Sequence, residues 1–252
     1  MKSDLNNEYQ WIPGAMYPPE LDWLKHNVVS AGIDTVIECG RQDGASALWM
    51  YENLPNVEIY SIDLDDRPSI AQSSVQRLKH TSVNAITGNI FDVVPQIVRA
   101  KRNSKIAIIE DAVKGWPGLC LLSSMIFYPN VRLIAQHNVH IGHFTRDFWL
   151  QLSGHRAFLE SSEDQNLSAG MENWIRQNKV RYSNRSLDHS SLAVSNLEED
   201  RIDKIDFVLQ NLKKFGNWNP IDYRKVHGGE TSKFYSNFKR NSMISRVLSK
   251  KR

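Results

Sequence analysis

Polar or glycine residues follow five short apolar segments of this chain. They are Glu38-Cys39-Gly40, Asp63, Gly88-Asn89, Glu110-Asp111 and His137-Asn138. An acid such as Asp63 can accept hydrogen bonds from both hydroxyls of a diol, and His137 could take up a proton near neutral pH. The competing interpretations are a solvated acid in an Asp-rich turn and an ordinary hydrogen-bonded histidine at a strand end.

The first of these positions belongs to the stretch 34–46. Thr35-Val36-Ile37 is a β-branched run typical of a buried strand, and Gly40 and Gly44 follow it before a small-residue segment that can begin a helix. Strand, glycine turn and helix together bring a ligand against bare backbone and a helix N-terminus. Glycine is needed where φ is positive or where a Cβ would collide. The same pattern also occurs in many proteins that bind no ligand there.

Short apolar strands alternate with helical segments along the first two thirds of the chain. The predicted strands are 35–37, 58–62, 83–87, 106–109 and 131–135, and the predicted helices are 18–32, 48–50, 70–78, 93–100, 117–127, 144–152 and 169–178. Such alternation is the signature of βαβ units. We therefore expect an α/β fold with a doubly wound, mostly parallel sheet of about seven strands and helices on both faces.

The last third of the chain is less regular. Segments 180–184 and 192–195 could form two antiparallel strands at the sheet edge. The apolar residues Ile202, Ile205, Leu209 and Leu212 recur at helical spacing, so 198–215 is predicted as an amphipathic helix. We expect one domain over 1–197 and a helical, basic extension over 198–252. The basic tail could meet an acidic surface or phosphate, or it could be a solvated end.

Composition describes an ordinary globular protein. The chain has 252 residues, of which 41% are hydrophobic and 23% charged, with a formal net charge of +3. That charge is too small to argue for nucleic acid as a partner. Cys39 and Cys120 both lie in apolar segments, so free buried thiols are expected, which fits a reducing compartment. The N-terminus lacks a signal-peptide core and no run is long enough for a membrane span, so a cytoplasmic location is expected.

These residues together resemble a class I S-adenosylmethionine-dependent methyltransferase, and more narrowly the catechol O-methyltransferase type. Glu38-x-Gly40-x-x-x-Gly44-x-Ser46 is similar to that group's first motif, and Asp111-Ala112-Val113-Lys114 matches its Asp-x-x-Lys. Residues 133–139 resemble the strand that completes its metal site. The stretch 111–115 also resembles the cephalosporin-hydroxylase-like and sugar O-methyltransferases. The resemblance covers 34–139 and implies a Rossmann-like fold.

The resemblance implies a cofactor site for S-adenosylmethionine. Its implied residues are Glu38, Gly40, Gly44, Ser46, Asp63, Gly88, Asn89, Ile90 and Asp111. Asp63 would bind the ribose, and the segment that begins at Gly88 would contact the adenine. Ser46 could hold the methionine carboxylate near a helix N-terminus, or it could simply cap that helix. Glu38 could fix the glycine loop or accept from the cofactor's amino group.

The resemblance also implies the catalytic residues. Lys114 is the implied general base, which requires desolvation or a nearby cation to lower its pKa; the alternative is a surface lysine. Asp111, His137 and Asn138 could hold a divalent metal that acidifies an acceptor oxygen. Without a metal, His137 could itself be the base.

The sequence departs from the related patterns at three places. His137 stands where the family has an aspartate, and histidine suits magnesium less well than an oxygen ligand. Asn89-Ile90 replaces a more usual polar pair near the adenine. Gln42 occupies the middle glycine position of the dinucleotide-binding Gly-x-Gly-x-x-Gly, so the loop fits a sulfonium nucleoside better.

We therefore expect an enzyme, an O-methyltransferase that acts on a hydroxyl of a small molecule or a sugar. The first alternative is a binding or accessory protein that keeps the fold but has lost catalysis. The second is a nucleic-acid methyltransferase, which would need a target-base motif that 110–113 does not supply. A homodimer is kept open.

Overall fold

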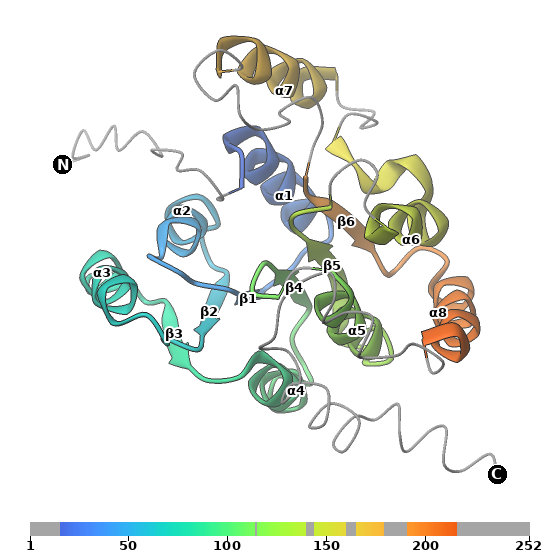
Figure 1. The fold of residues 1–252 in the computed structure, drawn as a ribbon, viewed down its shortest axis with the longest axis horizontal. Helices are drawn as coiled ribbons and strands as arrows, with labels where there is room; N and C mark the ends of the chain where they lie inside the picture. The colour runs from blue at the N-terminus through green and yellow to red at the C-terminus, as the bar shows by residue number, and fades with distance from the viewer. Residues whose placement is uncertain (1–15, 114, 140–143, 160–164, 179–190, 216–252) are drawn as a thin grey trace, which may run out of the picture.

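A six-stranded sheet forms the centre of the fold in the computed structural model (Figure 1). The structure describes residues 16–113, 115–139, 144–159, 165–178 and 191–215. The strands are β1 (Thr35–Cys39), β2 (Glu58–Asp63), β3 (Asn84–Thr87), β4 (Ile106–Glu110), β5 (Val131–Gln136) and β6 (Ala193–Asn196). The helices are α1 (Pro18–Ser30), α2 (Ala45–Asn53), α3 (Pro68–Leu78), α4 (Ile90–Ala100), α5 (Trp116–Met125), α6 (Phe144–Ser153), α7 (Gln165–Asn178) and α8 (Arg201–Phe215), with a 3-10 helix η1 (Gly154–Ala157) after α6.

The strands lie in the order β3-β2-β1-β4-β5-β6. Strands β1 to β5 are parallel, and β6 is antiparallel to β5. The chain builds outward from β1 to β3 and then returns to the other side of β1 with β4. The direction of winding therefore reverses between β1 and β4. In doubly wound sheets, ligands bind outside the carboxyl ends of the strands at such a switch point.

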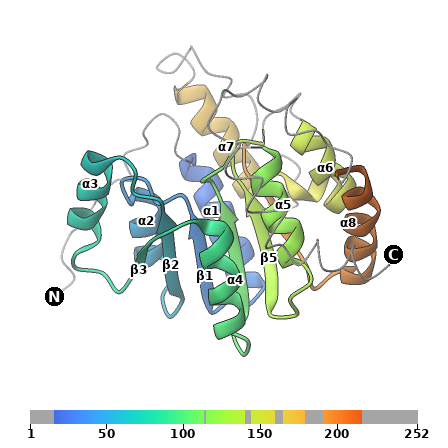
Figure 2. The same ribbon diagram turned by 60° about the horizontal axis from the view of Figure 1, so that its bottom comes forward.

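Helices cover both faces of the sheet (Figure 2). Along β4 the buried side chains alternate: Ile106 and Ile108 join the core under α4 and α5, whereas Ala107 and Ile109 join the core under α1 and α2. This alternation is the ordinary consequence of strand geometry. It explains why the strands read as continuous apolar runs, because both of their faces are buried.

The predicted α/β class, the doubly wound parallel sheet and the helices on both faces are confirmed. Six strands are present in the described residues, where about seven were expected for this fold. The predicted strand 180–184 and the basic tail lie outside the described residues. Cys39 and Cys120 are buried free thiols, as expected. The division of the chain at residue 197 stays a prediction. None of the described helices combines the length and apolar character needed to cross a membrane.

The buried face of α8 differs from the predicted one. Ile202, expected on the apolar face, is 75% exposed, whereas Val208 and Lys204 are buried. The cause lies in the first turn of the helix. The Arg201 guanidinium donates to the carbonyls of Ile126, Tyr128 and Val131, and the Lys204 amine donates to those of Asn196 and Glu199. These bonds fix the rotation of α8 and leave Ile202 in solvent.

Backbone hydrogen bonds continue across the sheet beyond the strand ends. The N–H of Gly40 donates to Ile62 O (2.8 Å), that of Asp111 to Cys39 O (2.8 Å), and that of His137 to Glu110 O (2.9 Å). The N–H of Gly88 likewise donates to the carbonyl of Asp63 at 2.8 Å. The residue that leaves one strand is therefore fixed to the end of its neighbour, which aligns the polar strand ends along one edge.

Helix α5 begins directly behind the end of β4. A Cβ at Gly118 would lie 2.0 Å from Oε2 of Glu110 and 2.5 Å from the carbonyl oxygen of Val113. Glu110 is fully buried, so its side chain has little room to move away. The close approach of helix and strand end therefore requires glycine at this position.

We expect Gly118→Ala to lower the free energy of unfolding by about 1–3 kcal/mol through overpacking. Alanine is otherwise favoured over glycine inside helices by about 1 kcal/mol, so the sign is diagnostic. Urea denaturation measures the change. The matched control is Gly170→Ala in α7, where no atom lies within 4 Å of the added Cβ, and it should be neutral or stabilising. Equal stability of the two variants would contradict the packing described here.

Candidate functional site

A cavity of about 190 Å³ opens at the carboxyl ends of β1, β2 and β4. Five residues from the predicted cofactor set line it: Gly40, Asp63, Asn89, Ile90 and Asp111. The other four, Glu38, Gly44, Ser46 and Gly88, are not among its lining residues. The cavity lies at the switch point between β1 and β4, where the topology of the sheet leads one to expect a ligand.

Gly40 is where the loop after β1 meets the loop after β4. Its φ is +99°, and a Cβ there would lie 2.8 Å from the backbone nitrogen of Ala112. The glycine is therefore required by the contact between two backbones as well as by its positive φ. Gly44, with φ +82°, precedes the first residue of α2 and packs against Leu78.

Glu38 lies beneath this loop and is 1% exposed. The hydroxyl of Ser46 donates to its Oε1, and the hydroxyl of Ser61 donates to its Oε2 at 2.5 Å. Burial raises the pKa of Glu38 to about 7, against the opposing effect of these hydrogen bonds. Glu38 thus ties the start of α2 to β2. Both of its predicted roles, fixing the loop and accepting from the cofactor's amino group, stay predictions. The N-cap position of α2 is Gly44, and the Ser46 hydroxyl bonds to Glu38.

Asp63 faces the cavity and is held by two backbone groups. Its Oδ2 accepts from the N–H of Gln42 at 2.9 Å, and its Oδ1 accepts from the N–H of Asp65 at 3.1 Å. Each carboxylate oxygen has a further lone pair available. Both oxygens could therefore still accept a hydrogen bond from a ligand in the cavity.

Asn89 and Ile90 form the wall contributed by the start of α4. The side-chain oxygen of Asn89 accepts from the N–H of Phe91 at 3.0 Å, which makes Asn89 the N-cap of this helix. Ile90 is 4% exposed and also belongs to the core. A Cβ at Gly88 would lie 2.8 Å from Cγ2 of Val93, so Gly88 allows the turn into α4 to pack closely.

Glu110 is a second fully buried acid, at the end of β4. Its Oε1 accepts from the N–H of Val113 at 2.7 Å, and Gln136 lies 3.4 Å from its Oε2. Burial raises the pKa of Glu110 to about 8, and the negative charge of Asp111 acts in the same direction. Gln136 also bonds to the carbonyl of Gly115 and accepts from the indole N–H of Trp149. The loop after β4 is therefore fixed to β5 and α6.

Asp111, His137 and Asn138 come together, as predicted from the strand ends. Oδ1 of Asp111 lies 2.9 Å from Nδ1 of His137 and accepts from Nδ2 of Asn138 at 2.8 Å. Only Asp111 of the three lines the cavity; His137 is 4% exposed. Asn138 has a positive φ of 65°, which turns its amide back toward Asp111. Lys114 lies outside the described residues.

This cluster is a poor match for a magnesium ion. Its donors are one carboxylate, one imidazole and one amide, and Oδ1 of Asp111 is already engaged by both neighbours. Magnesium prefers oxygen ligands in an octahedral arrangement. The described residues contain no group of three or more His, Cys, Asp or Glu side chains arranged for a metal. We therefore derive no chemical step through a metal here, and the predicted metal site stays a prediction.

Glu20 of α1 was not singled out in the sequence, yet it reaches this cluster. It is fully buried, and its Oε1 accepts from the N–H groups of Ser191 (2.5 Å) and Leu192 (3.0 Å). Its Oε2 lies 3.8 Å from Nε2 of His137. His137 is thus placed between a buried carboxylate and Asp111. The partners of Glu20 are about 170 positions away in sequence, so only its place in the first turn of a helix could have drawn notice.

Six further residues line the cavity but were not among the predicted site residues. They are Gln42, Leu64, Asp66, Arg67, Ala112 and Val113. Leu64 is 55% exposed, which is unusual for a leucine directly after a buried strand. Its place beside Asp63 was the one available signal, because the residue after a strand-end acid shares the same edge of the sheet.

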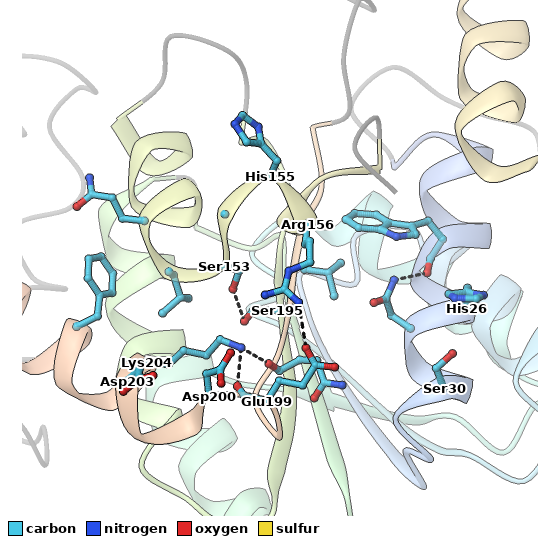
Figure 3. A pocket seen from close by; sticks show the side chains of 18 residues that line it. His26, Ser30, Ser153, His155, Arg156, Ser195, Glu199, Asp200, Asp203 and Lys204 are labelled. Carbon is cyan, nitrogen blue, oxygen red and sulfur yellow. Dashed lines mark hydrogen bonds and ion pairs between the residues drawn. The ribbon is translucent and has the colours of Figure 1, made fainter. Parts of the chain in front are cut away.

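A larger cavity of about 730 Å³ lies between α1, η1, β6 and α8 (Figure 3). None of the predicted site residues lines it. Several of its polar groups already have partners: Ser153 bonds to Ser195 at 2.6 Å, and the Lys204 amine donates to two backbone carbonyls. It borders Asn196, which pairs with Leu133 in the first half of β5, away from the strand ends that carry the acids. We assign it no role.

Comparisons with known proteins find similar structures but no matching sequence. No family model and no curated protein matches the chain. An O-methyltransferase from Streptomyces achromogenes involved in tomaymycin synthesis, in complex with SAM, is 15% identical, with 71% of this chain and 79% of that chain covered and a TM-score of 0.43. An SAH-bound methyltransferase from Podospora anserina is 16% identical, with 69% and 72% covered and a TM-score of 0.41.

A Klebsiella pneumoniae protein provisionally described as an O-methyltransferase is 16% identical, with 75% and 84% covered and a TM-score of 0.43. Identity and TM-score are low in all three cases. The assignment of a function therefore depends on this chain's own residues.

The buried acid Glu38 makes stability depend on pH. An unfolded glutamate has a pKa of about 4.3, whereas that of Glu38 is raised to about 7. The folded state therefore binds the proton more tightly. The contribution of Glu38 is fully present below the unfolded pKa and is lost as the pH rises through 7. We expect the urea concentration at the midpoint of unfolding to decrease as the pH is raised from 5.5 to 8.5. The Glu38→Gln variant should show a smaller decrease.

The matched control is Glu58→Gln. Glu58 is partly exposed and pairs with Lys101, and its pKa is lowered, so its proton exchange lies at acid pH. In this variant the urea midpoint should depend on pH as it does in wild type between pH 5.5 and 8.5. A Glu38→Gln protein whose midpoint falls as steeply as that of wild type would show that Glu38 does not hold its proton in the folded state.

Proposed function

We propose that this protein is an S-adenosylmethionine-dependent O-methyltransferase that acts on a hydroxyl of a small molecule or a sugar. One observation carries the proposal. The cavity at the switch point of the sheet has Asp63 on the β2 side and Asp111 on the β4 side, with bare backbone at Gly40 between them. This arrangement suits a nucleoside whose reactive end must point toward a second substrate.

The nucleoside part of the cofactor fits the residues around Asp63. Asp63 would accept from the ribose hydroxyls, and Leu64 and Ile90 supply apolar surface for a base on the same side of the cavity. The cavity, of about 190 Å³, is smaller than the range of about 300–1,000 Å³ typical of whole-ligand pockets. We therefore place the nucleoside here and the amino-acid end of the cofactor along the loop that contains Gly40.

S-adenosylmethionine would supply an electrophilic methyl carbon for an in-line displacement. The protein must then hold an acceptor hydroxyl in line and remove its proton. We assign proton removal to Nε2 of His137, because Nδ1 lies 2.9 Å from the Asp111 carboxylate that orients the ring. Nε2 lies 3.8 Å from the buried Glu20, so this role requires the imidazole to turn toward the acceptor when the acceptor binds. Asn138 binds Asp111 and so fixes the orienting carboxylate. Lys114 remains the alternative base that the family resemblance implies.

A second candidate function is a binding protein that keeps the fold and the cofactor but does not transfer methyl groups. Two observations favour it: His137 is almost fully buried, and the polar atoms of Asp111, His137 and Asn138 bond to one another. A base must reach the proton it removes, directly or through one water molecule. In this alternative the hydrogen bonds among Asp111, His137 and Asn138 would have only a structural role at the ends of β4 and β5. A small-molecule partner, a cytoplasmic location and a homodimer stay predictions under either function.

Calorimetric titration with S-adenosylhomocysteine tests the cofactor site. We expect Asp63→Asn to weaken binding by about tenfold or more, because hydrogen bonds to a charged group contribute about 1.5–3 kcal/mol. The matched control is Asp66→Asn: Asp66 lines the same cavity, but its side chain is 71% exposed. That variant should bind within about threefold of wild type. If wild type binds neither S-adenosylmethionine nor its demethylated product at millimolar concentration, the proposed function is wrong.

The role of His137 is tested by separating binding from turnover. With an acceptor found by screening phenols and sugars against methyl-labelled S-adenosylmethionine, His137→Gln should lower kcat by about 10²–10⁴-fold, the usual contribution of a general base. Its affinity for S-adenosylhomocysteine should stay within about twofold, because His137 does not line the cofactor cavity. Unchanged kcat in this variant would remove His137 from the reaction and leave Lys114 as the base.

A further inference from the structure

Arg41 is a buried arginine in the glycine loop after β1, only 3% exposed. Its guanidinium donates to four different partners. Nη1 donates to the carbonyls of Ser61 (2.8 Å) and Ile86 (3.1 Å), Nε donates to the hydroxyl of Ser74 (3.2 Å), and Nη2 forms an ion pair with Asp65. One side chain thus connects the loop after β1 to β2, β3 and α3.

Arg41 does not line the cofactor cavity, whereas its chain neighbours Gly40 and Gln42 do. The side chain points into the protein, beneath the strand ends. A buried charge is unfavourable unless it is paired and fully hydrogen-bonded. Asp65 supplies the pairing, and its carboxylate also accepts from the hydroxyl of Thr87. None of these contacts explains by itself why the loop should need an arginine.

The two groups that hold Asp63 both depend on Arg41. The N–H of Gln42, the residue after Arg41, donates to one oxygen of Asp63, and the N–H of Asp65, the ion-pair partner of Arg41, donates to the other. Gln42 and Asp65 both have positive φ, at 46° and 53°. A positive φ is uncommon for residues other than glycine, although aspartate adopts it more readily than glutamine, and surrounding contacts must hold it in place. Arg41 acts on both residues: it precedes Gln42 in the chain, and it forms the ion pair with Asp65.

We propose that Arg41 is a positioning residue that aims the Asp63 carboxylate at the ribose hydroxyls, and so sets the preference of this site for a ribose over a deoxyribose. This inference rests on the proposed function. Arg41 itself touches no ligand. It acts through Gln42 and Asp65, which orient the two oxygens of Asp63 toward the cavity.

Arginine suits this role better than lysine. Its planar guanidinium presents donors in a fixed fork, so it can bind a carboxylate, a hydroxyl and two carbonyls at once. A lysine ammonium could keep the ion pair with Asp65 but could not reach Ser61, Ile86 and Ser74 together. Arg41→Lys should therefore keep the charge and loosen the geometry of Asp63.

The test measures three affinities for each variant by calorimetry and compares that of the parent compound with that of each deoxy analogue. The probes are S-adenosylhomocysteine and its 2′-deoxy and 3′-deoxy analogues. In wild type, loss of a hydroxyl should weaken binding by about tenfold or more. In Arg41→Lys that ratio should fall below about threefold, as it should in Asp63→Asn, because a misaligned carboxylate no longer distinguishes the hydroxyl.

The matched control is Arg77→Lys. Arg77 of α3 also bonds to the glycine loop, at Asp43, but it is partly exposed and touches none of the groups that hold Asp63. This variant should keep the wild-type ratio. If Arg41→Lys does not fold, Asp65→Asn replaces it, since Asp65 is the link between Arg41 and one oxygen of Asp63.

A double-variant cycle separates positioning from general stabilisation. If Arg41 acts through Asp63, adding Arg41→Lys to Asp63→Asn should change the affinity for S-adenosylhomocysteine by less than about twofold. Additive losses, or equal weakening of the parent compound and both deoxy analogues, would overturn the inference. A wild-type protein that binds none of the three probes would instead overturn the proposed cofactor site, and the two failures are distinguishable.

Discussion

The site depends on the continuation of the parallel ladder beyond the ends of its strands. The backbone N–H of a residue just after one strand donates to a carbonyl at the end of the neighbouring strand: Gly40 to Ile62, Asp111 to Cys39 and His137 to Glu110. Because these bonds are made by backbone groups, they set the positions of the side chains that follow without requiring any of them. The side chains at this edge can therefore take part in binding or catalysis, because the backbone hydrogen bonds alone fix their positions. A single positive-φ glycine, Gly40, lets the two central loops meet at the switch point.

Three buried charged or titratable side chains then fix the loops to the sheet. Glu38 holds the start of α2, Glu110 holds the loop after β4, and Arg41 holds the acids after β2. Each is expensive to bury and is stable only because its hydrogen bonds are satisfied. Their hydrogen bonds restrict the conformations of the loops that form the cavity wall before a ligand binds. Pre-organised sites of this kind lose less entropy on binding than flexible ones.

Much of the fold was predictable because its signals are local. Apolar runs and helical spacing gave the elements, and polar strand ends gave the edge on which Asp63 and Asp111 lie. The contacts that orient those residues were not predictable, because they join distant parts of the chain. Arg41 bonds to residues 20, 24, 33 and 45 positions away, and Glu20 to residues more than 170 positions away. The exposure of Ile202 had a similar cause, since Arg201 and Lys204 set the rotation of α8 through bonds to backbone carbonyls.

The most direct measurement is a crystal structure of the protein with S-adenosylhomocysteine. We expect density for the adenosine in the cavity lined by Asp63, Leu64 and Ile90, with both ribose hydroxyls within hydrogen-bond distance of the Asp63 carboxylate. The sulfur should point toward Asp111 and the strand end that carries His137. Density for the ligand in the larger cavity between α1 and α8, with no contact to Asp63, would contradict the proposed cofactor site.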